Sequence, residues 1–270
     1  MQPTTINPRT IWRNFRSLFT NRLTWPEAEY LVNHERKLIY CPIAKVACSS
    51  IKRWFLSLAG EQIPDDASIH KAARRHRLRE QSALAALRAL RDPRYVKFTF
   101  FRNPWSRLVS AYLNKFLRVN SCSTRFAEEM SSPSPPARDD KGLVQITFAQ
   151  FVQHLAATNP ARYDVHWRPQ YLYLTGHQFD FVGRFERLSD DFAELQQKLG
   201  TSTPLARCKT TRYAAEQQQT QIVADLTPSE LLARGPLPDY RWFFTPALRE
   251  LAQRIYEPDI RLGKYEFAAE

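Results

Sequence analysis

The sequence predicts an α/β fold in which a parallel sheet is flanked by helices. Two short β-rich runs, residues 37–43 and 94–101, are each followed by a tight turn and an amphipathic helix. A third run of this kind, residues 178–185, also leads into a helix. Strands that alternate with helices are typical of a sheet covered by helices, and the chain shows no internal repeat at a solenoid period.

The composition is that of a folded, basic protein. Of the 270 residues, 43% are apolar and 13% aromatic, which excludes a wholly disordered chain. The formal net charge is +12, and between His70 and Arg107 eleven basic residues face only two acidic ones. Such a concentration of charge favours an anionic partner. We do not expect nucleic acid, because the sequence has neither an aromatic stacking platform nor a known nucleic-acid-binding motif.

Several common sites are excluded by residue counts and spacing. The seven glycines form neither G-x-G-x-x-G nor G-x-x-x-x-G-K-[ST], so the dinucleotide fingerprint and the Walker A loop are absent from the sequence. The four cysteines form no C-x-x-C pair and the six histidines no H-E-x-x-H. We therefore expect no metal cofactor. The sequence shows no signal peptide, and its longest run without charged residues, 142–161, is too polar for a bilayer. We expect a cytoplasmic protein, or one of the Golgi lumen if an anchor has been removed.

The first strand–turn–helix unit follows an N-terminal arm. Residues 1–36 are expected to form this arm with one or two short helices, and residues 37–270 a single domain. Residues 37–43 are expected to form a strand and residues 49–59 a helix that Gly60 ends.

The second unit is built in the same way. The strand at 94–101 is expected to lead through Arg102 and Asn103 into a helix over 105–117, with Pro104 at its first position. Between the units, residues 71–91 are expected to form one helix with a solvated basic face, its leucines 78, 84, 87 and 90 turned inward.

The rest of the chain is expected to contain a loop and further helices. Serines, prolines and Gly142 predict a loop over residues 118–145, a mobile insertion. Thr147 is expected to cap a helix over 148–157, and Ser189 a helix that ends at Gly200. Further helices are expected to begin near Pro228 and Pro246.

The turn after the first strand has the chemistry of an anion-binding loop. Ligands of α/β folds bind at the carboxyl ends of the strands, and a helix N-terminus favours phosphate or sulfate. The loop Ala44–Ser50 combines small residues with one lysine and two serine hydroxyls. Its composition suits the work of a P-loop with far less glycine. On these residues alone, an ordinary capped helix with a surface lysine explains the pattern as well.

The turn after the second strand carries an arginine where the strand ends. Arg102 can bind a phosphate through two parallel hydrogen bonds. Ser110 lies two helical turns further on, and its hydroxyl is placed to complete a phosphate site if both side chains share one side. The alternative is a helix start with solvated arginines.

Taken together, these two loops resemble those of a known enzyme family. Ala44–Arg53 resembles the 5′-phosphosulfate loop of carbohydrate sulfotransferases, the chondroitin and dermatan type among the Golgi sulfotransferases. Arg102–Tyr112 resembles their 3′-phosphate motif, R-x-P-x-x-R-L-V-S-A-Y, with each fixed position filled. His166–Tyr171 and Phe181–Glu186 resemble later segments of the family, so the resemblance spans about residues 37–213.

The resemblance implies a sulfotransferase fold, a donor and a set of binding residues. The donor would be 3′-phosphoadenosine 5′-phosphosulfate (PAPS), and the acceptor a carbohydrate hydroxyl, in an acidic glycan or another glycoconjugate. Arg102 and Ser110 would bind the 3′-phosphate, and a later segment, Lys209, Thr210 and Thr211, would close over the nucleotide. The 5′-phosphosulfate would be bound by the loop residues Ala44, Lys45, Val46, Ala47, Cys48, Ser49 and Ser50.

The sequence departs from the family pattern at two positions in these loops. Ala44 stands where proline usually precedes the loop lysine, and Asn103 replaces the acid that commonly follows the motif arginine. The N-terminal membrane anchor of the relatives is not recognisable either.

Two histidines are candidates for the base that takes a proton from the acceptor hydroxyl. His70 lies between the two motifs, where related sulfotransferases carry a catalytic histidine, and His166 lies in the matched H-W-R-P-Q segment. Lys45 is the candidate for stabilising the leaving oxygen. Arginines 74, 75, 77 and 168 are candidates for binding an acidic saccharide. The alternative to an enzyme is a non-catalytic module that binds anionic polysaccharide or nucleic acid.

Overall fold

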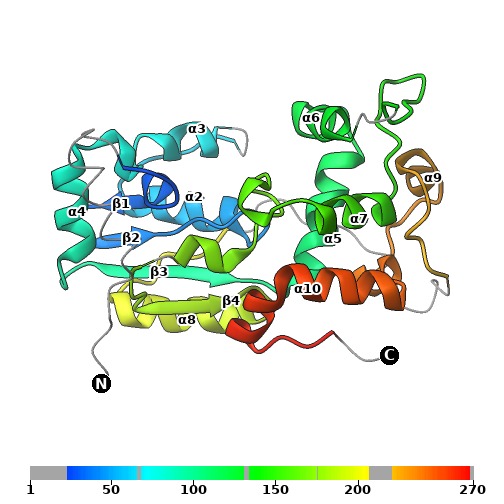
Figure 1. The fold of residues 1–270 in the computed structure, drawn as a ribbon. Helices are drawn as coiled ribbons and strands as arrows, with labels where there is room; N and C mark the ends of the chain where they lie inside the picture. Colours follow the sequence, from blue (N-terminus) through cyan, green and yellow to red (C-terminus); the bar gives the residue numbers. More distant parts are fainter. Residues whose placement is uncertain (1–22, 66–67, 131–133, 175, 207–220, 268–270) are drawn as a thin grey trace. The chain divides into compact units, whose positions relative to one another are not determined.

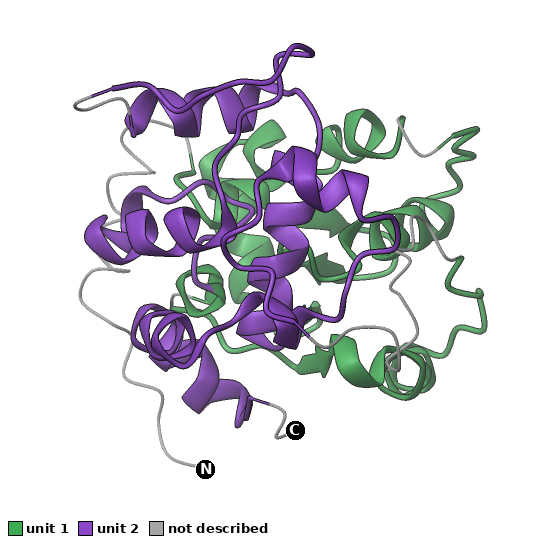
Figure 2. Ribbon diagram, turned by 90° about the vertical axis from the view of Figure 1, so that its right-hand side faces the viewer, with its two compact units in different colours: residues 1–101, 170–209 green, residues 102–169, 210–270 purple. Residues whose placement is uncertain are grey.

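The computed structural model describes residues 23–65, 68–130, 134–174, 176–206 and 221–267. The chain forms two compact units, which Figure 2 shows in different colours. The first unit comprises residues 1–101 and 170–209, and the second comprises residues 102–169 and 210–270. The described part of the first unit contains the β-sheet, and that of the second is built mainly of helices (Figure 1).

The four-stranded sheet of the first unit has the order β1-β2-β3-β4 (Figure 1). Its strands are β1 (Leu31–Asn33), β2 (Leu38–Tyr40), β3 (Val96–Phe101) and β4 (Phe181–Arg184). Strands β2, β3 and β4 are parallel, which confirms the predicted sheet, and β1 adds antiparallel to β2. Strand β1 corrects the prediction of an arm over residues 1–36, because its three residues are buried in the sheet.

Two helices of the first unit pack on one face of the sheet. Trp54 of α2 (Cys48–Leu58) contacts the ring of Phe98 in β3 and that of Phe192 in α8 (Leu188–Leu199). Because both rings touch the same indole, α2 and α8 share that face. The close packing requires glycine at position 183, where a Cβ would lie 2.3 Å from the Phe100 ring.

Helix α8 differs from the prediction at its start. It begins at Leu188 with Arg187 at the N-cap, so Ser189 is inside the helix and does not cap it. The reason is the short turn Phe185–Arg187, which leads directly into the helix. Its end agrees with the prediction, because Gly200 adopts a left-handed conformation there with φ of +61°.

The basic segment between α2 and β3 is not the single helix predicted over 71–91. It forms α3 (Ile69–Arg74), a short turn at Leu78–Glu80 and α4 (Ala83–Arg91). The break arises because the chain pairs here with the sheet edge: Val32 N donates to His76 O, and Leu78 N donates to Tyr30 O. Leu84, expected to point inward, is 48% exposed, whereas the leucines at 78, 87 and 90 are buried.

The second unit consists of α5 (Pro104–Phe116), α6 (Ser121–Glu129), α7 (Phe148–Ala157), α9 (Pro228–Ala233) and α10 (Pro246–Gly263). Helix α5 contacts α6, α7 and α10, so it forms the centre of this unit. The start of α7 after Thr147, with a capping box, and the starts of α9 and α10 at proline confirm the predictions. Other short 3₁₀ turns occur at Glu27–Glu29, Pro160–Arg162, Gln170–Leu174 and Tyr240–Phe243.

Helix α6 replaces part of the loop predicted over residues 118–145. The side chain of Asn120 caps it by accepting hydrogen bonds from the backbone N–H groups of Cys122 and Ser123. Phe126 is buried and its ring contacts that of Phe151 in α7. This one buried aromatic residue fixes the helix, although the surrounding sequence is polar. None of the helices within the described ranges is long and apolar enough to cross a membrane.

Candidate functional site

The β2–α2 loop has a backbone that ordinary side chains rarely adopt. Lys45 and Ala47 both have left-handed conformations, with φ of 68° and 48°. Each such residue costs about 1–2 kcal/mol relative to the right-handed region. Strain of this kind persists where the surrounding structure enforces it, and it is concentrated at ligand-binding sites.

The same loop leaves the start of α2 without a side-chain cap. Ala47 occupies the N-cap position, and alanine has no side-chain oxygen that could accept from the first N–H groups. Helix α2 has 11 residues, so its N-terminus carries a substantial positive dipole end. Together with Lys45, this arrangement suits an anionic group.

The structure places His70 beside this loop, within the first unit. His70 is exposed on α3, and its Nε2 lies 3.4 Å from the hydroxyl oxygen of Ser49. Its Nδ1 lies 3.3 Å from Nζ of Lys52, one turn further along α2. Burial lowers the pKa of Lys52, and Arg77 adds to this while Cys48 opposes it. Lys52 was not predicted from the sequence. Its spacing of three residues from Ser49 places both side chains on one face of α2, and this spacing could have pointed to it.

The β3–α5 loop differs because a side chain caps its helix. Asn103 Oδ1 accepts hydrogen bonds from the N–H groups of Trp105 and Ser106, at 3.0 and 3.3 Å. Arg102 Nε donates to Ser106 Oγ at 3.0 Å. Since Ser106 and Ser110 are one turn apart on α5, Arg102 lies along the helix face that carries Ser110. Both Arg102 and Ser110 are largely buried, 9% and 8% exposed.

The other motif arginine has a structural position. Arg107 is 1% exposed, and its guanidinium donates to the carbonyl oxygens of Arg168 and Val165 at 2.9 and 3.4 Å. Tyr256 of α10 adds a hydrogen bond from its hydroxyl to the carbonyl of Trp167, at 2.6 Å. These contacts hold the backbone of residues 165–168 against the core of the second unit.

His166, the second candidate base, forms a dyad with an aspartate. Its Nδ1 lies 2.5 Å from Asp164 Oδ1. Burial raises the pKa of Asp164, but hydrogen bonds from His166 outweigh it, and the net direction is a lowered pKa. Cys122 of α6 completes a cluster, since its Sγ lies within 4.8 Å of the ligand atoms of Asp164 and His166. Burial and the Asp164 charge raise the pKa of Cys122 to about 12. The D-x-H spacing was the signal for Asp164.

Three of the four arginines expected to bind an acidic saccharide have partners within their own unit. Arg75 forms an ion pair with Glu61 at 2.7 Å, and Arg77 one with Glu29 at 3.0 Å. Arg168 donates to the carbonyl of Tyr163. Arg74 is exposed on α3, on the same helix as His70. The expected lid segment, Lys209 to Thr211, lies outside the described residues.

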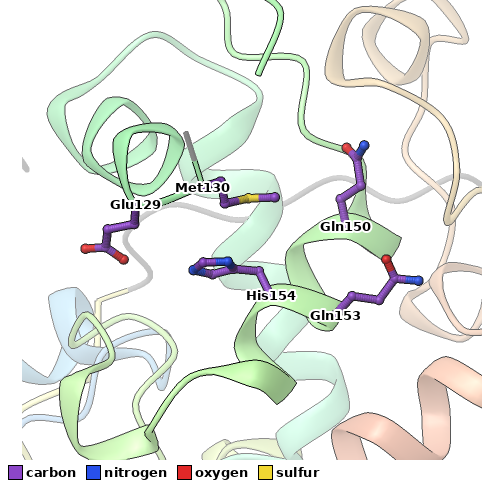
Figure 3. A pocket seen from close by; sticks show the side chains of 5 residues that line it. All are labelled: Glu129, Met130, Gln150, Gln153 and His154. Carbon is purple, nitrogen blue, oxygen red and sulfur yellow. The ribbon is translucent and has the colours of Figure 1, made fainter. Parts of the chain in front are cut away.

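Two pockets occur away from these residues. One, of about 270 Å³, lies between the end of α6 and α7 in the second unit, where Figure 3 shows its lining side chains around His154. The other, of about 490 Å³, lies along β4 and α8 and carries mixed charges from Arg184, Arg187 and Glu194. Neither is lined by a residue predicted for the site.

Comparison with known proteins gives a consistent match. A family model described as "Sulfotransferase family" matches residues 28–266. Carbohydrate sulfotransferase 14 of Homo sapiens is 34% identical over 177 residues, which cover 60% of this chain and 44% of that protein. Carbohydrate sulfotransferase 14 of Danio rerio is 31% identical over 189 residues, covering 63% and 48%. Carbohydrate sulfotransferase 11 of Mus musculus is 30% identical over 192 residues, covering 64% and 53%.

The matches with these relatives are partial in length. The chain spans about half the length of the curated relatives it matches. No solved structure matches the chain significantly.

Proposed function

Because the chain belongs to the sulfotransferase family, we propose that it transfers a sulfuryl group from PAPS to a hydroxyl of a carbohydrate acceptor. The observation that carries this proposal is the β2–α2 loop. Its two left-handed residues and its uncapped helix start suit an anion near Lys45, and His70 lies beside Ser49 of the same segment. The proposal therefore rests on a family match and on geometry within one unit.

The residues of the two loops suit the two charged ends of the donor. Lys45 and the segment from Val46 to Ser50, preceded by Ala44, bind the 5′-phosphosulfate in this proposal. Arg102 and Ser110 bind the 3′-phosphate through side chains, because Asn103 already caps α5. Lys209, Thr210 and Thr211 are proposed to close over the nucleotide.

The donor supplies an activated sulfuryl group, and the protein supplies positioned charge and a base. The ammonium of Lys45 stabilises the negative charge that develops on the leaving phosphate oxygen. His70 removes the proton of the acceptor hydroxyl. The ammonium of Lys52 lies 3.3 Å from Nδ1 of His70, and its positive charge favours the neutral imidazole over the imidazolium. These steps require no metal ion.

The chemical class of the acceptor and the cellular compartment are also part of the proposal. The names of the relatives, carbohydrate sulfotransferases 14 and 11, favour a carbohydrate. Exposed Arg74, on the same helix as His70, suits an acidic one. Of the two expected compartments, the resemblance to Golgi-type enzymes favours the Golgi lumen over the cytoplasm.

The test is transfer of labelled sulfate from PAPS to a panel of glycans. The wild-type chain is expected to label at least one glycan, and His70→Ala to lose nearly all turnover while His166→Ala keeps most of it. If His166→Ala abolishes transfer and His70→Ala does not, His166 is the base. If heparin or DNA stabilises the protein but no glycan is labelled and PAPS does not bind, the chain is a binding module and the proposal fails.

A further inference from the structure

We propose that Cys122, Asp164 and His166 form a binding site for a single zinc ion in the second unit. The proposal goes beyond sulfuryl transfer, which requires no metal. The three ligand atoms lie within 4.8 Å of one another and come from two separate segments, the first turn of α6 and the turn after residue 163. No spacing in the sequence connects Cys122 with Asp164 and His166, so the fold brings the thiol to the other two ligands.

The donor set selects the type of cation. Thiolate sulfur, imidazole nitrogen and carboxylate oxygen are the three ligand types that zinc accepts, whereas magnesium and calcium prefer oxygen alone. Zinc binding displaces the thiol proton of Cys122 into solvent. The resulting thiolate and the Asp164 carboxylate together carry two negative charges, which neutralise a divalent ion. Three protein ligands leave the fourth tetrahedral position to water.

Small side-chain movements close the site around an ion. Zinc bond lengths place neighbouring tetrahedral ligands about 3.5 Å apart. His166 Nδ1 and Asp164 Oδ1 are 2.5 Å apart, so on zinc binding their hydrogen bond breaks and the imidazole carries its proton on Nε2, while the sulfur moves inward. All three side chains are partly exposed, which leaves room for such rotations.

The backbone that carries the three ligands is firmly held. Asn120 caps α6 and bonds to Cys122 N at 2.9 Å. The carbonyls of Val165 and Arg168 are bound by Arg107. The ring of Phe126 in α6 contacts that of Trp167 with centroids 5.5 Å apart, so the two ligand-bearing segments pack directly on each other. Supporting contacts of this kind orient metal ligands in proteins.

Nearby positive charges are expected to lower the affinity for a cation, so removing one of them should change the affinity in the opposite direction to removing a ligand. Lys115 and Arg125 act electrostatically on Cys122. Removing the Lys115 charge is therefore expected to strengthen cation binding, whereas removing a ligand weakens it. A nonspecific effect of mutation on the fold does not produce both signs.

The experiment is titration of the full, untagged chain with ZnCl₂ under reducing conditions, together with Co²⁺ absorption. One ion per chain is expected, with a thiolate-to-cobalt charge-transfer band. Cys122→Ser and Asp164→Asn are each expected to weaken zinc binding more than about tenfold. Cys122→Ser is also expected to remove the charge-transfer band. Lys115→Gln is expected to strengthen zinc binding. Cys48→Ser, which changes another partly exposed thiol, is the matched control and keeps both signals.

Two results overturn the proposal. One is a wild-type chain that takes up no stoichiometric zinc. The other is a Cys122→Ser variant that binds zinc as tightly as the wild type. Circular dichroism shows whether each variant is folded. If Cys122→Ser does not fold, His166→Gln provides a second variant that lacks one ligand. The readout is metal binding, so its outcome is independent of whether sulfuryl transfer is found.

Discussion

The starts of α2 and α5 follow neighbouring parallel strands, but they are built in opposite ways. At α2 the backbone is left-handed at Lys45 and Ala47, and the N-cap residue has no side-chain acceptor. At α5 the side chain of Asn103 occupies the first N–H groups, and Pro104 fixes the first turn. We call these two helix starts openings. The first opening, at α2, is strained and uncapped, and the second opening, at α5, is relaxed and closed by its side-chain cap. The difference is the basis of our proposal that α2 binds an anion through its backbone, whereas the second loop relies on the side chains of Arg102 and Ser110.

The largest effect is expected from the lysine of the strained loop. Lys45→Ala should lower kcat/KM about 100- to 1000-fold, because it removes one positioned charge worth about 2.7–4 kcal/mol. Steady-state kinetics with PAPS and a labelled acceptor measure this. Lys37→Ala is the matched control, since Lys37 is another left-handed lysine, with φ of 49°, in the β1–β2 turn. An equal loss in both variants would show that the backbone conformation, and not the charge at 45, is responsible.

Substitutions of the two motif arginines, Arg102 and Arg107, should affect different quantities, one the nucleotide affinity and the other the stability of the fold. Arg107→Ala removes a buried guanidinium that donates to two backbone carbonyl groups, so the free energy of unfolding should fall by at least about 2 kcal/mol. Arg102→Ala should leave stability nearly unchanged but weaken the preference for adenosine 3′,5′-bisphosphate over ADP about ten- to hundredfold. Denaturant unfolding and nucleotide titration measure the two effects. If Arg102→Ala keeps the preference, its assigned role is wrong.

A smaller effect is expected from the cap that distinguishes the openings. Asn103→Ala should cost about 1 kcal/mol of stability, because two first-turn N–H groups of α5 lose their acceptor. Its effect on nucleotide affinity should be slight, since the bound phosphate contacts side chains there. Thermal unfolding with and without bisphosphate measures both quantities, and Asn103→Ser, which keeps an acceptor, is the control. A large loss of affinity in the alanine variant alone would show that the α5 cap supports the phosphate site directly.

The smallest effect concerns Lys52. Its pKa is lowered in the folded protein, so between that value and the ordinary 10.5 the unfolded chain binds more protons, and stability rises with pH. Lys52→Met should remove this rise and increase stability near neutral pH by less than about 1 kcal/mol. The acid limb of the pH–activity profile should also move to higher pH, because His70 loses a neighbouring positive charge. A variant whose profile and stability slope are both unchanged contradicts this account of Lys52.

Local patterns predicted much of the fold but not the contacts between distant segments. Hydrophobic spacing and caps located α2, α5 and α7 to within one residue of their observed ends. Strand β1 was missed because three residues show no periodicity, and the helix over 71–91 was broken by hydrogen bonds to that strand. Helix α6 was missed because one buried aromatic residue, Phe126, stabilises it in a polar stretch.

The family motifs predicted residues for the candidate site, and the roles of those residues stay predictions. The order of the motifs pointed to His70 and to the loop of Lys45, and the structure adds the contact between Ser49 and His70. The cluster of Cys122 with Asp164 and His166 was invisible in the sequence, because Cys122 lies about 40 residues before the other two and its helix reaches them through the packing of Phe126 on Trp167.

The central proposal is that Lys45 at the start of α2 and Arg102 before α5 each contribute to nucleotide binding, and calorimetric titration with adenosine 3′,5′-bisphosphate tests it most directly. We expect one molecule of the bisphosphate to bind per chain, and we expect Lys45→Ala and Arg102→Ala each to weaken its affinity. The affinity for ADP should fall in the Lys45→Ala variant alone. Two bound molecules per chain, or wild-type affinity in either variant, would contradict the account.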